Sequence, residues 1–347
     1  MTAPAPPDLT HGPEWAALEL LCHPASTQGR DEGIHALLAS RDLHWGELIE
    51  QAIRHKLLPL LAGHLADRPY GDLVARPLAT HMRQAFRSNQ HRTRIYRAEA
   101  LRVTTALAAA GVPVAVTGAL ALEPTIYAGE GTRNFTDLDL LIAPTLYQRA
   151  SDILTKLGYQ PARPGIHLRR IEDPIAPTLV VDVATSLPPG TSRTTGTAVD
   201  TILNRRYRQP LPGRQSDAGL PVLATTDLAL THVLTWSRKA WHGDDLTLLA
   251  LADLLRLWTT TPDLRRPVTL EASPLWTAAR HCTPWMLAVL DQIFGTTLID
   301  QTGSAPYLAA TDTYQEHVPQ PDTVRERMHA KRHPSRSQGT TTGTDEP

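Results

Sequence analysis

Two aspartates one position apart, Asp137 and Asp139, lie in the alternating segment FTDLDLLIAP. Side chains at positions i and i+2 of a strand project to the same face, so the two carboxylates are expected side by side, with Leu138 and Leu140 facing the core. Adjacent carboxylates repel each other, and a hard cation such as Mg²⁺ relieves that repulsion while leaving ligand positions for substrate phosphates. The pair therefore predicts a metal-binding site on a strand.

A third acid, Asp182, lies in the apolar segment TLVVDVAT. Alternation places it opposite Val181 and Val183, and an aspartate in so apolar a strand is costly unless it meets a cation or a donor. Three carboxylates from two strands suit phosphoryl transfer with two metal ions, one activating the attacking hydroxyl and one holding the triphosphate. We therefore expect Asp137, Asp139 and Asp182 to be the catalytic and metal-binding residues. The plainer alternative is a solvated strand end and an edge-strand carboxylate.

Two further residues near the acids could contact phosphate. Gly118 follows the strand-like residues 112–117 and begins a segment with helical potential, so backbone N–H groups there can point at an anion. Glycine also permits the close approach of backbone to phosphate, although a single glycine at this place can be only a turn. Arg133 precedes Asp137 by four residues, and both a triphosphate contact and a salt bridge to a nearby acid are open for it.

These residues must be positioned by secondary-structure elements, and the order of helical and strand-like segments along the chain predicts an α+β fold. It is a small mixed sheet flanked by N-terminal and C-terminal helical regions. The expected regions are a disordered N-terminus (1–12), a helical region (13–110), an α/β core (111–220), a second helical region (221–305) and a largely disordered tail (306–347).

Several individual elements can be predicted within these regions. A long helix from about Pro77 to Ala110 ends at Gly111, as a C′ glycine commonly does. The segments IHLRRI and TLVVDVAT, joined by EDPIAP, predict a β-hairpin. A helix with Thr226 or Asp227 as its N-cap is expected from about residue 225.

Composition narrows the classes of protein that the chain can be. Its 347 residues carry a formal net charge of −1, which gives no general attraction to nucleic acid or to an anionic membrane. Two cysteines far apart in sequence exclude a disulfide framework and a cysteine-rich zinc site. No apolar run approaches the roughly 20 residues that span a bilayer, and the first residues resemble no secretory signal. We expect a soluble, cytoplasmic protein without membrane partners and without a strong nucleic-acid signature.

Weaker signals are divided between functional and structural interpretations. His167 and Arg169 share a strand face; a solvated hairpin face is favoured for them over a place beside Asp182. An exposed helix face is favoured over RNA phosphate binding for the long helix's arginines, which are Arg83, Arg87, Arg94 and Arg97. The C-terminal helices offer substrate-cleft candidates, which are His232, Lys239 and His242. Trp236 and Trp241 are expected to pack at the interface between the lobes.

The order of these motifs resembles the DNA polymerase β-type nucleotidyltransferase superfamily. More narrowly, it resembles the bacterial family of uncharacterised nucleotidyltransferases, over about residues 15–260. The motifs that carry the resemblance are the helical DLHWGELIEQAIRHKLLPLL, the strand GVPVAVTG, the helix ALALEPTIY, the strand RNFTDLDLLIAP and a helix ending in LGY.

The resemblance implies that the small mixed sheet is of the nucleotidyltransferase type, and it implies roles for particular residues. Asp137 and Asp139 would bind the divalent ions, Mg²⁺ or Mn²⁺, and Asp182 would be the third acid, which binds the catalytic ion and helps to deprotonate the acceptor. Gly118 and Ala119 would occupy the phosphate-loop positions, with Arg133 as a candidate phosphate contact. The substrate would be an NTP, with ATP favoured. The acceptor hydroxyl is open among a small molecule, a protein side chain and a tRNA end.

Three positions depart from the family pattern. Thr117 stands where a lysine is usual, Ala119 replaces the serine that is usual in the superfamily, and Ala184 replaces a histidine. A catalytically reduced module that binds a nucleotide or a partner on the same fold is therefore an alternative. A toxin that modifies tRNA is a further one.

Overall fold

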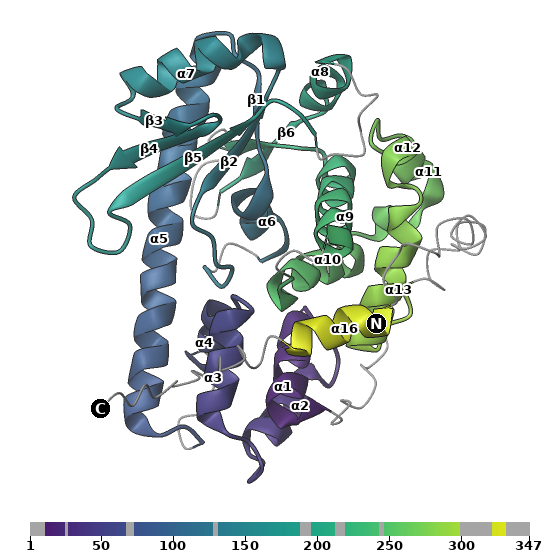
Figure 1. Cartoon of the computed structure of the whole chain (residues 1–347). Coiled ribbons are helices and arrows are strands. Elements are labelled where there is room, and N and C mark those ends of the chain that lie inside the picture. Colours follow the sequence, from purple (N-terminus) through teal and green to yellow (C-terminus); the bar gives the residue numbers. More distant parts are fainter. Residues whose placement is uncertain are drawn as a thin grey trace, which may run out of the picture.

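The computed structural model describes residues 11–24, 27–66, 73–127, 131–187, 196–211, 219–242, 246–298 and 321–330. Within these ranges a seven-stranded mixed sheet is flanked by helices that precede and follow it in the chain (Figure 1). The predicted α+β architecture is confirmed. No helix in the described ranges is long and apolar enough to cross a membrane.

Four short helices precede one long helix at the N-terminal side. They are α1 (Pro13–Cys22), α2 (Arg30–Leu38), α3 (Trp45–Arg54) and α4 (Leu58–Ala66), followed by α5 (Arg76–Ala109). Helix α5 runs from these helices up to the sheet, and its buried stripe includes Phe86, Tyr96 and Val103 (Figure 1). Its bounds agree with the prediction to within one residue at each end. The chain leaves it through Gly111, whose φ is +70°.

The sheet has the strand order β3-β4-β5-β2-β1-β7-β6. Its strands are β1 (Val114–Val116), β2 (Leu138–Ile142), β3 (Gln160–Arg163), β4 (Ile166–Arg170), β5 (Thr178–Ala184), β6 (Tyr207–Pro210) and β7 (Gly219–Val222). Strands β4 and β5 pair antiparallel, which confirms the predicted hairpin. Strand β2 pairs antiparallel with β1 and parallel with β5, so the two strands that carry acids are direct neighbours.

The remaining helices cover the sheet or form the C-terminal region. They are α6 (Gly118–Ile126), α7 (Tyr147–Lys156), α8 (Gly196–Asn204), α9 (Thr225–His242), α10 (Leu248–Thr260), α11 (Pro267–Glu271), α12 (Trp276–Ala279), α13 (Cys282–Phe294) and α16 (Pro321–Ala330), with 3₁₀ turns at Pro144–Leu146 and Pro262–Arg265. Helix α16 lies in the stretch predicted to be largely disordered, and its Val324 and Met328 are buried. The other residues predicted to be disordered, apart from 11 and 12, lie outside the described ranges.

The predicted N-cap of α9 was wrong. The helix begins at Thr225, and the Leu228 backbone N–H bonds the Ala224 carbonyl, so Thr226 and Asp227 lie in the first turn. Asp227 is fully buried, where it pairs with Arg205 at 3.0 Å and accepts a hydrogen bond from the Ser273 hydroxyl. A tertiary contact therefore takes the side chain that could have capped the helix.

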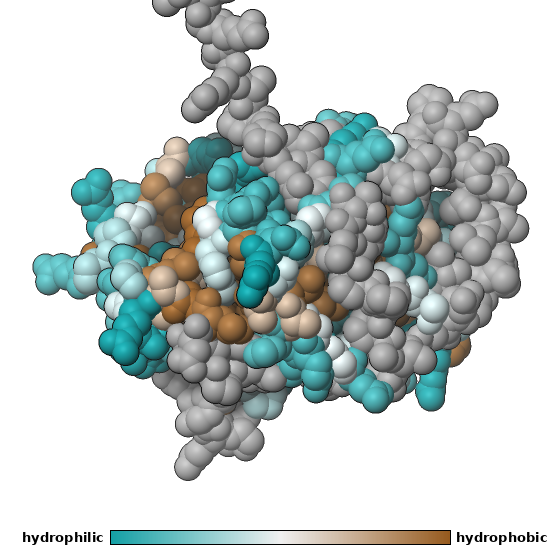
Figure 2. Space-filling view, turned by 90° about the horizontal axis from the view of Figure 1, so that it is seen from below, coloured by the Kyte–Doolittle hydropathy of each residue, from teal (hydrophilic) through white to brown (hydrophobic). Residues whose placement is uncertain are grey.

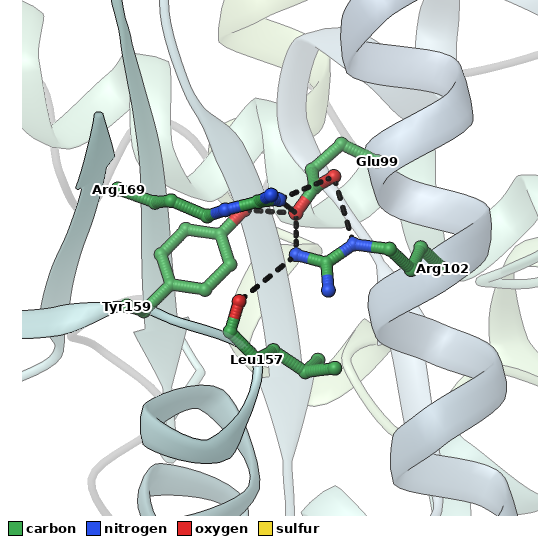
Figure 3. A network of polar contacts seen from close by, with 5 residues as sticks. All are labelled: Glu99, Arg102, Leu157, Tyr159 and Arg169. Carbon is green, nitrogen blue, oxygen red and sulfur yellow. Dashed lines mark hydrogen bonds and ion pairs between the residues drawn. The ribbon is translucent and has the colours of Figure 1, made fainter. Parts of the chain in front are cut away.

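A cluster around Glu99 fastens α5 to the edge of the sheet (Figure 3). The Glu99 carboxylate accepts a hydrogen bond of 2.6 Å from the Tyr159 hydroxyl and pairs with Arg169 of β4 at 3.1 Å. Arg102, one turn along α5, donates to the same carboxylate and to the Leu157 carbonyl. The hairpin that carries Asp182 is thereby held in a fixed position on the long helix.

Apolar surface gathers at the end of the molecule where the N-terminal helices lie (Figure 2). On α3, Ile53 is 58% exposed, and Trp45 and Ile49 precede it on the same helical face at four-residue spacing. Leu48 and Ala52, which adjoin this stripe at three-residue spacing, are buried against the rest of the molecule.

Candidate functional site

The three predicted acids lie on or beside the two neighbouring strands β2 and β5. Asp139 is within β2 and stands in register with Asp182 of β5, so their side chains share one face of the sheet. Asp137 immediately precedes β2 rather than lying within it. On β5 the valines on either side of Asp182 are buried, as the alternation predicts. The carboxylates of Asp139 and Asp182 are therefore side by side on adjacent strands.

Negative charge is crowded at these acids. The pKa of Asp139 is raised to about 7, first by burial and then by the charges of Asp137 and Asp182, against smaller opposing effects from Arg133 and the Ala119 backbone N–H. Burial and the charge of Asp137 also raise the pKa of Asp182, and Arg163 opposes this. A cation bound between the carboxylates would relieve this repulsion.

The donor chemistry fits a hard divalent cation. Carboxylate oxygens are the ligands that Mg²⁺ takes, usually one or two of them together with substrate phosphates. Among the described residues, no group of three or more histidines, cysteines, aspartates or glutamates is arranged so that it could hold an ion unaided. Asp137 and Asp139 would supply carboxylate ligands to such an ion, with its other ligand positions left to other groups.

Position 118 requires a glycine because the Asp139 carboxylate lies directly against it. Its φ is +60°, and an ideal Cβ at this position would lie 1.9 Å from the Asp139 Oδ2 atom. The Thr117 backbone N–H donates to the Asp139 carbonyl at 2.9 Å, which keeps β1 and β2 in this close approach. The sequence predicted a close approach of the backbone to phosphate, whereas in the structure it is the Asp139 carboxylate that approaches Gly118.

Arg133 forms a buried ion pair with Asp253 of α10. Its Nη2 lies 2.6 Å from one carboxylate oxygen and its Nε 3.2 Å from the other, and the Tyr127 hydroxyl donates to Asp253 at 2.9 Å. Of the two predicted interpretations, the structure shows the salt bridge. The guanidinium also lines the same cavity as Asp139, and its charge lowers the pKa of that carboxyl.

A cavity of about 390 Å³ opens in front of Asp137 and Asp139. Residues from all three regions of the chain line it, including Lys56, Gly118, Ala119, Arg133, Asp137, Asp139, His232, Trp236, Lys239, Thr247 and Asp253. Asp182 is outside this lining and joins the site through its register with Asp139. The cavity is large enough for part of a nucleotide and has both acidic and basic groups on its walls.

Two of the three substrate-cleft candidates predicted in the C-terminal helices line this cavity. His232 and Lys239 line it, whereas His242 is outside its lining. Burial lowers the pKa of His232 to about 4, so the ring is neutral, and its Nε2 atom has no hydrogen-bond partner within the described residues. Trp236 and Trp241 both pack against Trp285, with ring centroids 5.8 and 6.1 Å apart, so they stabilise the C-terminal helices.

The place beside Asp182 that was considered for His167 and Arg169 is wrong for both. In the β4–β5 pairing His167 stands opposite Val181 and Ile166 stands opposite Asp182, so His167 and Arg169 lie on the face away from Asp182. The favoured solvated face is also wrong for His167, which is 1% exposed and lies 3.0 Å from the Ser151 hydroxyl, whereas Arg169 is partly exposed. Neither side chain can replace the missing lysine or histidine beside the acids.

The arginines of α5 are not one continuous exposed row. Arg83, Arg87 and Arg94 are exposed, as predicted. Arg97 instead forms an ion pair with the buried Glu123 of α6, whose carboxylate also accepts the Gly131 backbone N–H at 2.9 Å. This pair attaches α6, the helix that follows Gly118, to the long helix.

Sequence reasoning missed two charged residues of the cavity, Lys56 and Asp253. Asp253 lies in the apolar helix segment LLALADLLRLW, where a lone acid signals a buried pairing, and this signal was available. Lys56 follows an amphipathic helix far from the acids in sequence, and only the three-dimensional structure places it in the same cavity.

One of three comparisons with known proteins identifies a family for the chain. A model of the family described as uncharacterised nucleotidyltransferases matches residues 41–283. No curated protein is significantly similar to the chain. The solution structure of the antibiotic-resistance factor ANT(2'')-Ia is similar over 54% of this chain and 91% of that chain, with 14% identity and a TM-score of 0.33, a likeness too weak to carry an argument. The family match includes every residue named above as lining the cavity, and Asp182 as well.

Proposed function

Since the chain belongs to the family of uncharacterised nucleotidyltransferases, we propose that it transfers a nucleoside monophosphate from an NTP to an acceptor hydroxyl in a Mg²⁺-dependent reaction. The observation that supports this most directly is the register of Asp139 with Asp182, beside Asp137 and in front of a cavity. Carboxylates from two adjacent strands could hold metal ions, which stabilise the negative charge that develops on the phosphate oxygens during the attack.

The reaction forms one bond and breaks one. The acceptor oxygen attacks the α-phosphorus, the bond from that phosphorus to the α–β bridging oxygen breaks, and pyrophosphate leaves. Asp137 and Asp139 would hold the divalent ion, which when bound would neutralise charge on the phosphates and activate the acceptor oxygen. Asp182, whose pKa is raised by burial and by Asp137, receives the proton of the acceptor hydroxyl.

The residues around the acids have supporting roles. Gly118 leaves room for the Asp139 carboxylate, and the Ala119 N–H at the start of α6 donates to it. Arg133, held by Asp253, keeps a fixed positive charge beside Asp139 and lowers its pKa. In this proposal the charge of Arg133 stabilises the ionised Asp139 carboxylate, and other cations of the cavity contact the triphosphate.

Release of pyrophosphate tests the proposal. The full chain is incubated with Mg²⁺, each of the four NTPs and one acceptor from each open class: an aminoglycoside-like polyol, a hydroxyl-bearing protein and tRNA. We expect pyrophosphate and a labelled acceptor with one class, and neither product from the Asp182→Asn variant.

The departures at Thr117 and Ala184 support one competing function, a module that binds the nucleotide without turnover. NTP binding by the wild type, with no pyrophosphate from any acceptor class, would favour that module and contradict the transferase. Asp152→Asn, which changes an exposed acid on α7, is the matched control for the loss of a carboxylate.

A further inference from the structure

The turn between α3 and α4 brings Lys56 to the cavity in a strained backbone conformation. Its φ is +61°, and within the described ranges it is the only residue other than glycine with a positive φ. A residue with a Cβ is disfavoured in this left-handed region by about 1–2 kcal/mol. Such an outlier beside a candidate site is a reason to look for a function of the side chain.

Glycine at position 56 would fit the end of α3 with less backbone strain than lysine. The Leu57 backbone N–H bonds the Ala52 carbonyl at 2.7 Å, and the Lys56 N–H bonds the Ile53 carbonyl at 3.0 Å. These two bonds end α3 and place Lys56 at the C′ position, where glycine is commonly found. The turn itself therefore gives no reason for a lysine.

Neighbouring His55 fixes this turn against the start of α10. Its Nδ1 atom accepts the Leu248 backbone N–H at 3.3 Å, and its carbonyl accepts the Leu249 N–H at 3.4 Å. Its ring is buried edge-on against Trp15, with centroids 5.2 Å apart. Lys56 is thereby held at the cavity wall beside Thr247 and Leu249, which also line it.

Lys56 shares the cavity with Lys239 of α9, which comes from the other helical region. The chain has four lysines, so two of the four face this one cavity. Both side chains are exposed, and the ion pairs formed among the described residues include neither. Arg133, by contrast, is already paired with Asp253. A lysine ammonium on a flexible stem binds phosphate as a point charge.

We infer that Lys56, together with Lys239, binds the triphosphate of the NTP, so that the strained turn of the N-terminal region completes the nucleotide site. The inference rests on the proposed function. It supplies a cation that Thr117 cannot provide, and it gives a reason for a lysine at a position where glycine would relieve strain.

Binding and unfolding measurements on the full chain test this inference. Each NTP is titrated with Mg²⁺ by calorimetry, the tightest is carried forward with its monophosphate, and thermal unfolding is recorded for each variant. Lys56→Gly should unfold at the same or a higher temperature, because strain is relieved, yet bind the triphosphate about tenfold more weakly. Its affinity for the monophosphate should be unchanged. Lys56→Arg, which keeps the charge and the strain, should retain most of the affinity, and Lys156→Ala on α7 should change nothing.

Five results would overturn the inference. The first is equal triphosphate affinity in Lys56→Gly and the wild type, which leaves the proposed function standing. The second is an equal loss for triphosphate and monophosphate, and the third is an equal loss in Lys56→Arg. A lower unfolding temperature in Lys56→Gly would show a structural role instead. Absence of NTP binding by the wild type with Mg²⁺ would remove both the inference and the proposed function.

Discussion

At the scale of single residues, the candidate site depends on the neighbouring positions of Asp139 and Asp182 and on the space that Gly118 leaves for the Asp139 carboxylate. Alternation along FTDLDLLIAP and TLVVDVAT places Asp139 and Asp182 on strand faces, and the structure adds the register that makes them neighbours. Gly118 could be recognised as special only because it follows a strand. Its close contact with the Asp139 carboxylate depends on the pairing of β1 with β2, which no local pattern shows.

The substitution Gly118→Ala tests whether that contact matters. A Cβ would lie 1.9 Å from the Asp139 Oδ2 atom at a φ of +60°, so the carboxylate must move. We expect the free energy of unfolding to fall by about 1–3 kcal/mol and Mg²⁺-dependent NTP binding to weaken. Urea unfolding and calorimetry measure the two effects.

The matched control is Gly46→Ala on α3. Nothing lies within 4 Å of the position of its Cβ, so stability should stay the same or rise by up to about 1 kcal/mol. If Gly118→Ala were as stable as the wild type and bound NTP equally well, the close approach to Asp139 would have no role in the site.

At the scale of elements, helices with a clear apolar stripe were predictable, and the short strands at or next to the sheet edges were not. Helix α5 shows the stripe over its whole length. Strands β3, β6 and β7 read QPAR, YRQP and GLPV, each with a proline and none with an alternating pattern. They are strands because a neighbour supplies the pairing, which is a tertiary effect that local sequence does not encode. Helix α8, beyond the predicted hairpin, was likewise missed.

The attachment of α5 to the sheet edge depends on Glu99, so Glu99→Gln should be destabilising. The variant leaves Arg102, Arg169 and the Tyr159 hydroxyl without their carboxylate (Figure 3). Because both arginines are partly exposed, we expect a loss of about 2 kcal/mol in the free energy of unfolding. Glu50→Gln removes an exposed pair with Arg54 and should cost less than about 1 kcal/mol.

The same variant predicts a pH dependence. Burial raises the pKa of Glu99, but hydrogen bonds from Arg102 and Tyr159 and the charges of Arg102 and Arg169 outweigh it, so the pKa lies below its ordinary value of 4.5. The stabilisation is thus complete above pH 4.5 and is lost as the pH falls through the lowered value. The stability gap between wild type and Glu99→Gln should narrow in acid. A gap that widened there would contradict this assignment.

At the scale of the whole molecule, α10 joins the N-terminal helices to the sheet. Its Asp253 binds Arg133 and Tyr127 beside the acids. One turn later, the Arg256 guanidinium lies 4.5 Å from the centre of the Tyr127 ring and donates to carbonyls at the end of α1, those of Leu21, Cys22 and His23. These long-range contacts explain why the cavity includes residues from all three regions, and no sequence pattern predicts them.

Removing the Arg256 side chain should loosen this connection. Arg256→Ala removes a donor from three carbonyls, of which that of Leu21 keeps its hydrogen bond from Arg30. We expect a loss of about 3 kcal/mol together with faster amide hydrogen exchange in α1. Arg266→Ala is the control, since its pair with Asp263 is exposed on both sides. Unchanged exchange in α1 would show that α10 does not hold the N-terminal region.

The most direct measurement of the central claim is calorimetric binding of the four NTPs, with and without Mg²⁺. It is made on the wild type, on Asp137→Asn/Asp139→Asn, and on Asp152→Asn as the control. The account predicts Mg²⁺-dependent binding to the wild type and the control, with binding lost in the double variant, because crowded carboxylates hold the ion that carries the triphosphate. Absence of NTP binding by the wild type with either Mg²⁺ or Mn²⁺, or equal binding by the double variant, would contradict it.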